Sequence, residues 1–199
     1  MATGSSTRSG WRVLRHTWLV IPLGFAVFWI YLATAAASQT RAAAHLLDAH
    51  GRRVGTVTFR QLPGGDSRVT FRVHGLPPGF HAFHVHEVGR CDPANAFSSA
   101  RGHFDKFDRA FPYDGDLPAI LVNADHTGSG STVTDRFEVG DVLGRSIAVQ
   151  AAPDNFGNVP VGTGPTDFAP VSPRAASRAR NTGDAGPIIA CGVIRQTRR

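Results

Sequence analysis

Cysteine is scarce in this chain of 199 residues: there are two, and none precedes Cys91. A lipoprotein anchor needs a cysteine near its cleavage site, so attachment of that kind is excluded. No repeat of fixed period runs along the sequence, and no segment has a convincing helical pattern. The 22 glycines and 13 prolines, spread among short alternating segments, disfavour a helix bundle. A hydrophobic content of 42% excludes wholesale disorder.

Lysine is nearly absent, with one lysine against 20 arginines, and the formal net charge is +6. Most of the basic excess lies at the two ends of the chain. Residues 38–173 hold twelve basic and fourteen acidic residues, a net charge of −2. A face that binds nucleic acid needs clustered cations on the folded surface. This balance therefore argues against nucleic acid as a partner.

Acidic residues are also absent from residues 1–37, which carry three arginines and then an apolar run over residues 18–37. A basic stretch, an apolar run and small residues are typical of a signal peptide, although about 20 apolar residues also suffice to span a bilayer. We therefore predict that residues 1–37 are a signal peptide or an N-terminal membrane anchor. Residues 38–199 then form one domain outside the cytoplasm. Only residues 18–37 would contact a membrane, and only if the signal is not cleaved.

The predicted location outside the cytoplasm bears on the state of Cys91 and Cys191. In an oxidising compartment an isolated pair of cysteines is typically a disulfide, and two free buried thiols are the alternative. A bridge would close a loop of about 100 residues, for which the chain-entropy model gives about 4–5 kcal/mol. It would also pin the loop that follows Glu87 to the last predicted strand.

Short segments rich in β-branched and aromatic residues, each bounded by Gly, Pro, Asp or Asn, predict about eight strands. They are residues 44–48, 54–60, 68–74, 80–86, 119–123, 132–139, 145–151 and 188–194. Two long stretches, 88–118 and 152–187, do not alternate, and loops of that length are often functional. Loss of order is the alternative for the second stretch. The sequence predicts an all-β fold, an eight-stranded antiparallel barrel or sandwich with two long loops.

Three histidines form the candidate site. His84 and His86 lie on the predicted strand 80–86, where alternation puts both imidazoles on one face. Two solvated surface histidines are the alternative for this pair. His103 follows 17 residues after His86, in the first long loop, and adds a third imidazole, which suits copper and zinc alike. His81 is predicted to be a hydrogen-bonded structural histidine.

Several sequence blocks surround these histidines in a fixed order. They are residues 79–87, 91, 102–104, 115–118, 144–149, 154 with 157, 182–186 and 190–193. Together they resemble the copper–zinc superoxide dismutase family, in its exported bacterial branch. The resemblance implies an eight-stranded Greek-key β-barrel, a copper cofactor and superoxide as the small-molecule substrate.

The resemblance also implies roles for single residues. His84 and His86 match two copper ligands. His103 matches the imidazolate that bridges copper and zinc, and it is the residue expected to take part in catalysis. Asp154 matches an aspartate that orients metal-bound histidines by fixing their tautomer and ring angle. The two cysteines match the family disulfide.

The zinc site departs from the family pattern. Asp116 matches the zinc carboxylate, but Phe111 and Tyr113 stand where the family has its two other zinc histidines. One carboxylate and one histidine cannot build a closed tetrahedral zinc site. We therefore expect no functional zinc site, and Asp116 alternatively caps a turn.

Two further departures concern copper and its substrate. Gln150 replaces the fourth copper histidine, and an amide oxygen is a poorer copper donor than imidazole. We expect Gln150 to be a weak or vacant fourth position that faces the site if the strand register holds. Ile188 replaces the active-site arginine, a cation that attracts the superoxide anion and stabilises developing charge. Candidates to replace it from the second loop are Arg174, Arg178 and Arg180.

Three functions are compatible with this reading. The first is a superoxide dismutase with a mononuclear, zinc-free copper site that converts superoxide to dioxygen and hydrogen peroxide, more slowly than the family does. The second is a catalytically silent family member that serves as a metal-binding or structural module outside the cytoplasm. A third, an interaction protein, would use the basic C-terminal residues Arg195, Arg198 and Arg199 against acidic surfaces.

Overall fold

The computed structural model describes residues 40–108, 112–155, 177 and 181–197. The chain separates into two units, Met1–Ser38 and Gln39–Arg199. The predicted signal or anchor lies outside the described residues. In the part of the chain that is described, no helix has the length and apolar character needed to cross a membrane.

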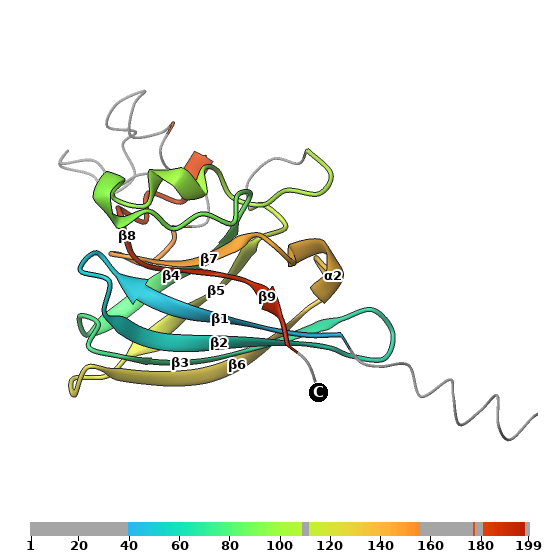
Figure 1. Cartoon of the computed structure of the whole chain (residues 1–199), viewed down its shortest axis with the longest axis horizontal. Helices are drawn as coiled ribbons and strands as arrows, with labels where there is room; N and C mark the ends of the chain where they lie inside the picture. The colour runs from blue at the N-terminus through green and yellow to red at the C-terminus, as the bar shows by residue number, and fades with distance from the viewer. Residues whose placement is uncertain (1–39, 109–111, 156–176, 178–180, 198–199) are drawn as a thin grey trace, which may run out of the picture. The chain divides into compact units, whose positions relative to one another are not determined.

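One antiparallel sheet curls into a nearly closed barrel (Figure 1). Its strands are β1 (Arg41–Asp48), β2 (Arg53–Gln61), β3 (Ser67–His74), β4 (Gly79–His86), β5 (Asp116–Val122), β6 (Thr127–Thr134), β7 (Ser146–Gln150), β8 (Ile188–Val193) and the short β9 (Arg195–Gln196). Neighbours follow the order β5-β4-β7-β8-β1-β2-β3-β6, and β9 pairs with β1. Helical elements in the described part of the chain include two 3₁₀ turns, Pro93–Asn95 and Ser98–Ala100, and α2 (Val139–Val142). The predicted eight-stranded all-β barrel is confirmed.

The barrel interior is filled by alternate side chains of its strands. On β4, Phe83 and Val85 point inward and join one apolar cluster with residues from β1, β2, β3, β5, β7 and β8. The largest fully buried members include Leu46, Val57, Phe59, Leu117, Ile120 and Ile147. The unit that begins at Gln39 therefore holds a complete barrel and core, which are the requirements of an independently folding domain.

The two ends of the sheet, β5 and β6, meet through a tight hairpin in which the Asn123 amide donates to the Thr127 carbonyl at 2.7 Å. Gly128 allows the backbones of β5 and β6 to lie close together after this hairpin. A Cβ at this position would collide with the carbonyl oxygen of Leu121 on β5. β5 and β6 can approach here because the second residue of β6, Gly128, has no side chain.

The largest error in the predicted strand boundaries concerns β6. The sequence predicted a strand over 132–139, whereas β6 spans Thr127–Thr134 and pairs with the full length of β3. Its first half is small and polar and carries no strand signal of its own, so pairing with β3 decides its conformation. Beyond it the chain turns into α2, where Glu138 and Asp141 form a reciprocal capping box.

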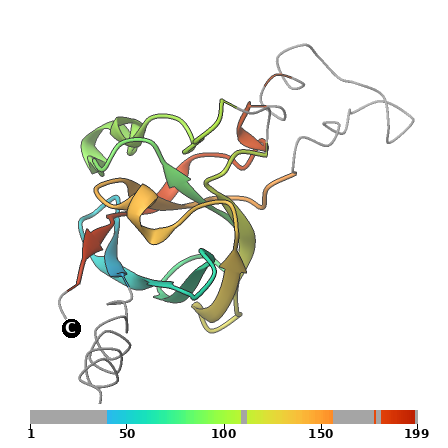
Figure 2. The same cartoon turned by 90° about the vertical axis from the view of Figure 1, so that its right-hand side faces the viewer.

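A disulfide joins Cys91 to Cys191 across 100 residues of sequence. It ties the segment after β4 to β8, and Phe97 and Ala100 pack against it in a small buried cluster. The predicted pairing is confirmed. Figures 1 and 2 both place the segment between β4 and β5 over β4 and β7, on the side away from β2 and β3.

Candidate metal centre

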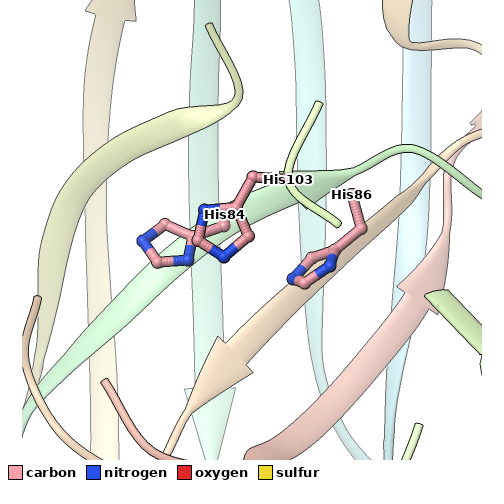
Figure 3. A group of neighbouring side chains, drawn as sticks. All are labelled: His84, His86 and His103. Carbon is pink, nitrogen blue, oxygen red and sulfur yellow. The ribbon is translucent and has the colours of Figure 1, made fainter. Parts of the chain in front are cut away.

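The three predicted histidines lie together in a buried site on the outer side of β4 (Figure 3). His84 and His86 come from β4, and His103 lies opposite His86 in an isolated antiparallel bridge. Ala148 and Ser146 of β7 face His84 and His86 across the sheet. Because these two partners are small, the imidazoles have room to stand above the strand while the loop that carries His103 covers them.

Each imidazole has one nitrogen held by a protein oxygen. Nε2 of His84 lies 2.8 Å from Oδ2 of Asp154, and Nδ1 of His86 lies 2.8 Å from the carbonyl oxygen of Arg101. Nδ1 of His103 lies 2.8 Å from Oδ1 of Asp116. Partners of this kind fix the tautomer and the ring orientation of a metal-binding histidine. They leave Nδ1 of His84 and Nε2 of both His86 and His103 to face one another.

These three remaining nitrogens converge on one small volume. One ligand atom from each of the three histidines lies within 4.8 Å of the other two. The rings of His84 and His103 have centroids 4.1 Å apart, and those of His86 and His103 are 5.0 Å apart. Nε2 of His86 is buried and has no hydrogen-bond partner in the described part of the chain. A buried polar atom without a partner is costly, and a bound metal ion would satisfy it.

The surroundings keep the imidazoles of His84 and His86 neutral, which is the state that binds metals. Burial lowers the pKa of His84, although its hydrogen bond to Asp154 opposes this effect. Burial lowers the pKa of His86 to about 4, and the neighbouring His103 lowers it further. At neutral pH both rings therefore offer a lone pair without having to lose a proton. This donor set fits copper, for which neutral imidazole is a suitable ligand.

Gln150, at the end of β7, faces the same volume. Its Nε2 lies 3.1 Å from Nδ1 of His84 and 3.5 Å from Nε2 of His103, and the residue is 4% exposed. It reaches the site because the face shared by Ser146, Ala148 and Gln150 is the face that carries the histidines on β4. The amide oxygen on the same carbon is the atom that would ligate a metal.

Asp116 stands where a second metal would have to bind. Its Oδ1 contacts Nδ1 of His103, and its Oδ2 accepts the backbone N–H of Tyr113 at 2.7 Å. Burial raises the pKa of Asp116, but the contact with His103 and the electrostatic interaction with the nearby His84 ring outweigh burial, and the net pKa is below its usual value. The carboxylate is therefore ionised and caps a turn while holding His103.

The two residues predicted to replace zinc histidines have different outcomes. The ring of Tyr113 packs edge-on against His103, with centroids 5.8 Å apart. Burial raises the pKa of the Tyr113 phenol, and the Asp116 charge adds to this, so the hydroxyl stays neutral and is a poor zinc ligand. Phe111 lies outside the described residues.

Asp154 is held by the segment that precedes β8. The amide of Asn155 donates to the carbonyl of Gly183 at 2.9 Å. Gly183 has φ +60°, and a Cβ there would collide with the Asp154 carboxylate. A glycine is required at this point so that Asp154 can reach His84.

Ile188, at the predicted position of the active-site arginine, is partly buried against the disulfide cluster and pairs with Gln150 across β7 and β8. It brings no charge to the site. Arg174, Arg178 and Arg180, the candidates to replace that cation, lie outside the described residues. Arg101 lies two residues from His103, and its side chain is exposed.

His81 is structural, as predicted: its two ring nitrogens lie 2.7 Å from the carbonyl oxygen of Gln150 and 2.8 Å from that of Pro77. Two features were not predicted from the sequence. The carbonyl of Arg101 orients His86, and no side-chain pattern signals a backbone contact. Asp116 contacts His103 directly; the absence of the zinc histidines was the available signal, but it does not say which partner the carboxylate takes instead.

The fold and the site together define a β-barrel metalloprotein with a buried histidine centre and a bridging disulfide. The family model for copper/zinc superoxide dismutase (SODC) matches residues 53–194. A Cu-Zn superoxide dismutase of Mycolicibacterium paratuberculosis is 35% identical over 166 residues, which cover 75% of this chain and 72% of that protein. A Cu-Zn superoxide dismutase of Deinococcus radiodurans is 35% identical over 167 residues, covering 74% of this chain and 91% of that protein. The crystal structure of the clock protein EA4 superposes with a TM-score of 0.64 at 26% identity, covering 81% of this chain and 97% of that one.

The chain therefore belongs to the copper/zinc superoxide dismutase family, and the resemblance inferred from its motifs is confirmed. The modest identity agrees with a divergent member. The homologues support a superoxide dismutase-like function at the level of the family. Family members use copper and zinc and act on superoxide, and the histidine cluster of this chain is suited to hold a metal ion.

Proposed function

We propose that this protein is a superoxide dismutase with a single copper ion, held by His84, His86 and His103, and with no zinc. Three buried imidazoles on a rigid strand and a tethered loop support a copper site. Gln150 provides a weak fourth position. The proposal goes beyond the family assignment in two respects: the ligands of the copper ion, and the residues that stand in place of the zinc ligands.

The contact between Asp116 and His103 is the observation that carries the zinc-free assignment. A zinc ion beside copper would need Nδ1 of His103, and that nitrogen lies 2.8 Å from a carboxylate oxygen. Among the described residues, the groups that face this side of His103 are Asp116 and the neutral Tyr113 ring. A closed zinc site needs four ligands, so the carboxylate takes over the task of holding the bridging histidine.

The protein groups have distinct tasks in the proposed reaction. Bound copper would supply the one-electron couple by which one superoxide is oxidised to dioxygen and the next is reduced to hydrogen peroxide. Asp154 and the Arg101 carbonyl keep His84 and His86 in one tautomer. Asp116 lies against Nδ1 of His103, which leaves Nε2 of this ring directed into the site.

The substrate is a small anion, and the site offers it little attraction. Ile188 is neutral, so a cation that would raise the local superoxide concentration is missing at that position. We therefore expect dismutation well below the diffusion limit that the fastest enzymes reach.

The test is metal analysis together with dismutation by the unit 38–199 after loading with copper, with zinc, or with both. One copper per chain, no zinc retained beside it and a rate above that of free copper support the proposal. A rate equal to free copper would end it. Retention of one zinc beside one copper would refute the zinc-free site alone.

A second candidate is a silent family member that stores or carries metal outside the cytoplasm. Gln150 and Ile188 favour it, because they replace a copper ligand and a charge that serve turnover. Electron paramagnetic resonance separates the two functions. A Cu(II) signal that disappears when superoxide is added supports the enzyme, and a site that takes up zinc or holds an unresponsive copper supports the silent protein.

The site of action that we propose is extracytoplasmic, either secreted or on the outer face of the cytoplasmic membrane. The disulfide supports this location, because such bonds persist in oxidising compartments. Cell fractionation with mass spectrometry of the N-terminus is the test. A mature chain that starts near residue 38 indicates a cleaved signal, an intact N-terminus in the membrane indicates an anchor, and an intact chain in the cytosol contradicts both.

A further inference from the structure

Three arginines stand side by side on the outer face of the barrel. Arg41 of β1 lies opposite Arg60 of β2, and Arg60 lies opposite Arg68 of β3. All three line one groove of about 340 Å³, together with Thr58 and Thr70. We refer to Arg41, Arg60 and Arg68 as the arginine row.

The row has no compensating charge in the described part of the chain. The ion pairs of arginine and lysine there are Arg52 with Asp48 and Lys106 with Asp141. Like charges placed directly opposite one another on neighbouring strands destabilise a sheet. An arrangement that weakens the fold and is balanced by no described carboxylate indicates a partner that carries the opposite charge.

The chemistry of the row fits phosphate. Arginine presents a planar set of donors that matches phosphate oxygens, and the hydroxyl of Thr58 adds a further donor to the groove. Val133 of β6 lies opposite Arg68 and is 48% exposed. An apolar side chain at the end of a cationic row suits a surface that has an apolar layer beneath its phosphates, which is a bilayer and not a nucleic acid.

The row is also close in the sequence to other features that suit an anionic surface. Arg41 follows the predicted apolar run of residues 18–37 by four residues. Thr197, which lines the same groove, is followed directly by Arg198 and Arg199 in the sequence.

We propose that the arginine row binds the phosphates of anionic phospholipids and lays the barrel on the outer surface of the cytoplasmic membrane. The segment that carries His103 covers β4 and β7 on the side away from β2 and β3 (Figures 1 and 2). Adsorption through the row would leave this segment facing away from the bilayer. This inference does not depend on the bound metal or on dismutation.

The test is flotation of the unit 38–199 with vesicles of phosphatidylglycerol mixed with phosphatidylcholine, compared with vesicles of phosphatidylcholine alone. The row variant is Arg41→Gln, Arg60→Gln and Arg68→Gln. The matched control removes equal charge from exposed positions outside the groove, with Arg53→Gln, Arg90→Gln and Arg101→Gln. A second control, Arg198→Gln with Arg199→Gln, tests the C-terminal tail.

The wild type should bind the anionic vesicles, more weakly at high salt, and should not bind phosphatidylcholine. The row variant should lose about 100-fold in partitioning, since each basic residue at an anionic surface contributes about fivefold. Its melting temperature should stay equal or rise, because a like-charge contact has been removed. The matched control should retain most of the binding.

Four results would overturn the proposal. They are equal loss in the matched control, loss in the tail variant with full binding by the row variant, equal binding to phosphatidylcholine, and binding to a DNA duplex without binding to vesicles. Competition by inorganic phosphate separates a single-ion site from a surface: complete displacement at low concentration would also count against the bilayer.

Discussion

Gln150 is the residue whose chemistry differs most from a copper ligand while its position suits one. Its amide lies 3.1 Å from Nδ1 of His84, in a buried volume shared with His103. A histidine at this position would add a neutral imidazole, a better donor for copper than an amide oxygen.

We expect Gln150→His to tighten Cu(II) binding by at least about tenfold, which corresponds to about 1.4 kcal/mol. Competition with a chromogenic chelator gives the affinity, and the Cu(II) resonance spectrum reports the added nitrogen. Gln150→Leu is the control, because it keeps the volume without a donor, and its affinity should not exceed that of the wild type. Unchanged affinity in the histidine variant would mean that residue 150 does not face the metal.

His86 makes the metal-free protein sensitive to acid. Its pKa is near 6.5 in an unfolded chain and is lowered to about 4 in the fold, with burial as the main cause. Between these two values the unfolded chain takes up a proton at this ring that the folded chain does not. The free energy of unfolding therefore falls as the pH drops through this window, by about 3 kcal/mol for this group.

Denaturant unfolding of the metal-free unit 38–199 across this pH range gives the slope. His86→Gln should flatten it, whereas His74→Gln, at an exposed position on β3, should leave it unchanged. Equal slopes in the wild type and in His86→Gln would exclude the buried neutral ring.

At the scale of elements, the disulfide couples the loop over the site to the last strand. The disulfide links residues that are 100 positions apart in the sequence. It packs in the small buried cluster that also contains Phe97 and Ala100. The chain continues from this cluster to Arg101, whose carbonyl holds His86. The same bond thus acts on stability and on the orientation of a proposed ligand.

We expect Cys91→Ser with Cys191→Ser to lower the free energy of unfolding by about 4–5 kcal/mol, the value for a loop of this length. Copper affinity should fall as well, because the segment that carries Arg101 and His103 is no longer pinned. Guanidinium unfolding of the variant, set beside the oxidised wild type, measures the loss of stability, and competition with a chromogenic chelator measures the copper affinity. A variant as stable as the oxidised wild type would contradict the entropic role of the bond.

Strand periodicity and motif spacing predict most of this fold and part of the site. The alternation of Phe83 and Val85 with His84 and His86 predicts which side of β4 carries imidazoles, and the structure has that arrangement. β6 was misplaced because its small polar residues become a strand only by pairing with β3. The contact of Asp116 with His103 was beyond prediction because it depends on where a loop folds back in space.

At the scale of the whole molecule, the distribution of charge differs from what the net charge predicts. The balance of −2 over residues 38–173 argued against a basic surface. The fold nevertheless aligns three arginines in one row on β1, β2 and β3, because their register places these positions opposite one another. Around the histidines the described charges are acidic: Asp116 and Asp154 lie against them, and position 188 is neutral. An anionic substrate therefore meets little attraction on the side where the reaction is proposed.

Placing a cation at position 188 tests whether the missing positive charge limits the attraction of superoxide to the site. We expect Ile188→Arg to raise the dismutation rate constant of the copper-loaded protein by about tenfold at low ionic strength, the lower end of electrostatic steering. The gain should shrink at high salt, because the Debye length falls from about 10 Å at 0.1 M to about 3 Å at 1 M. Ile188→Gln is the matched control, since it disturbs the apolar contact with the disulfide cluster without adding charge. Pulse radiolysis across a salt series measures the rate. If the gain in rate persisted at high salt, or if Ile188→Gln showed the same gain, local repacking would be its cause. The slow proposed rate would then need an explanation other than the missing charge.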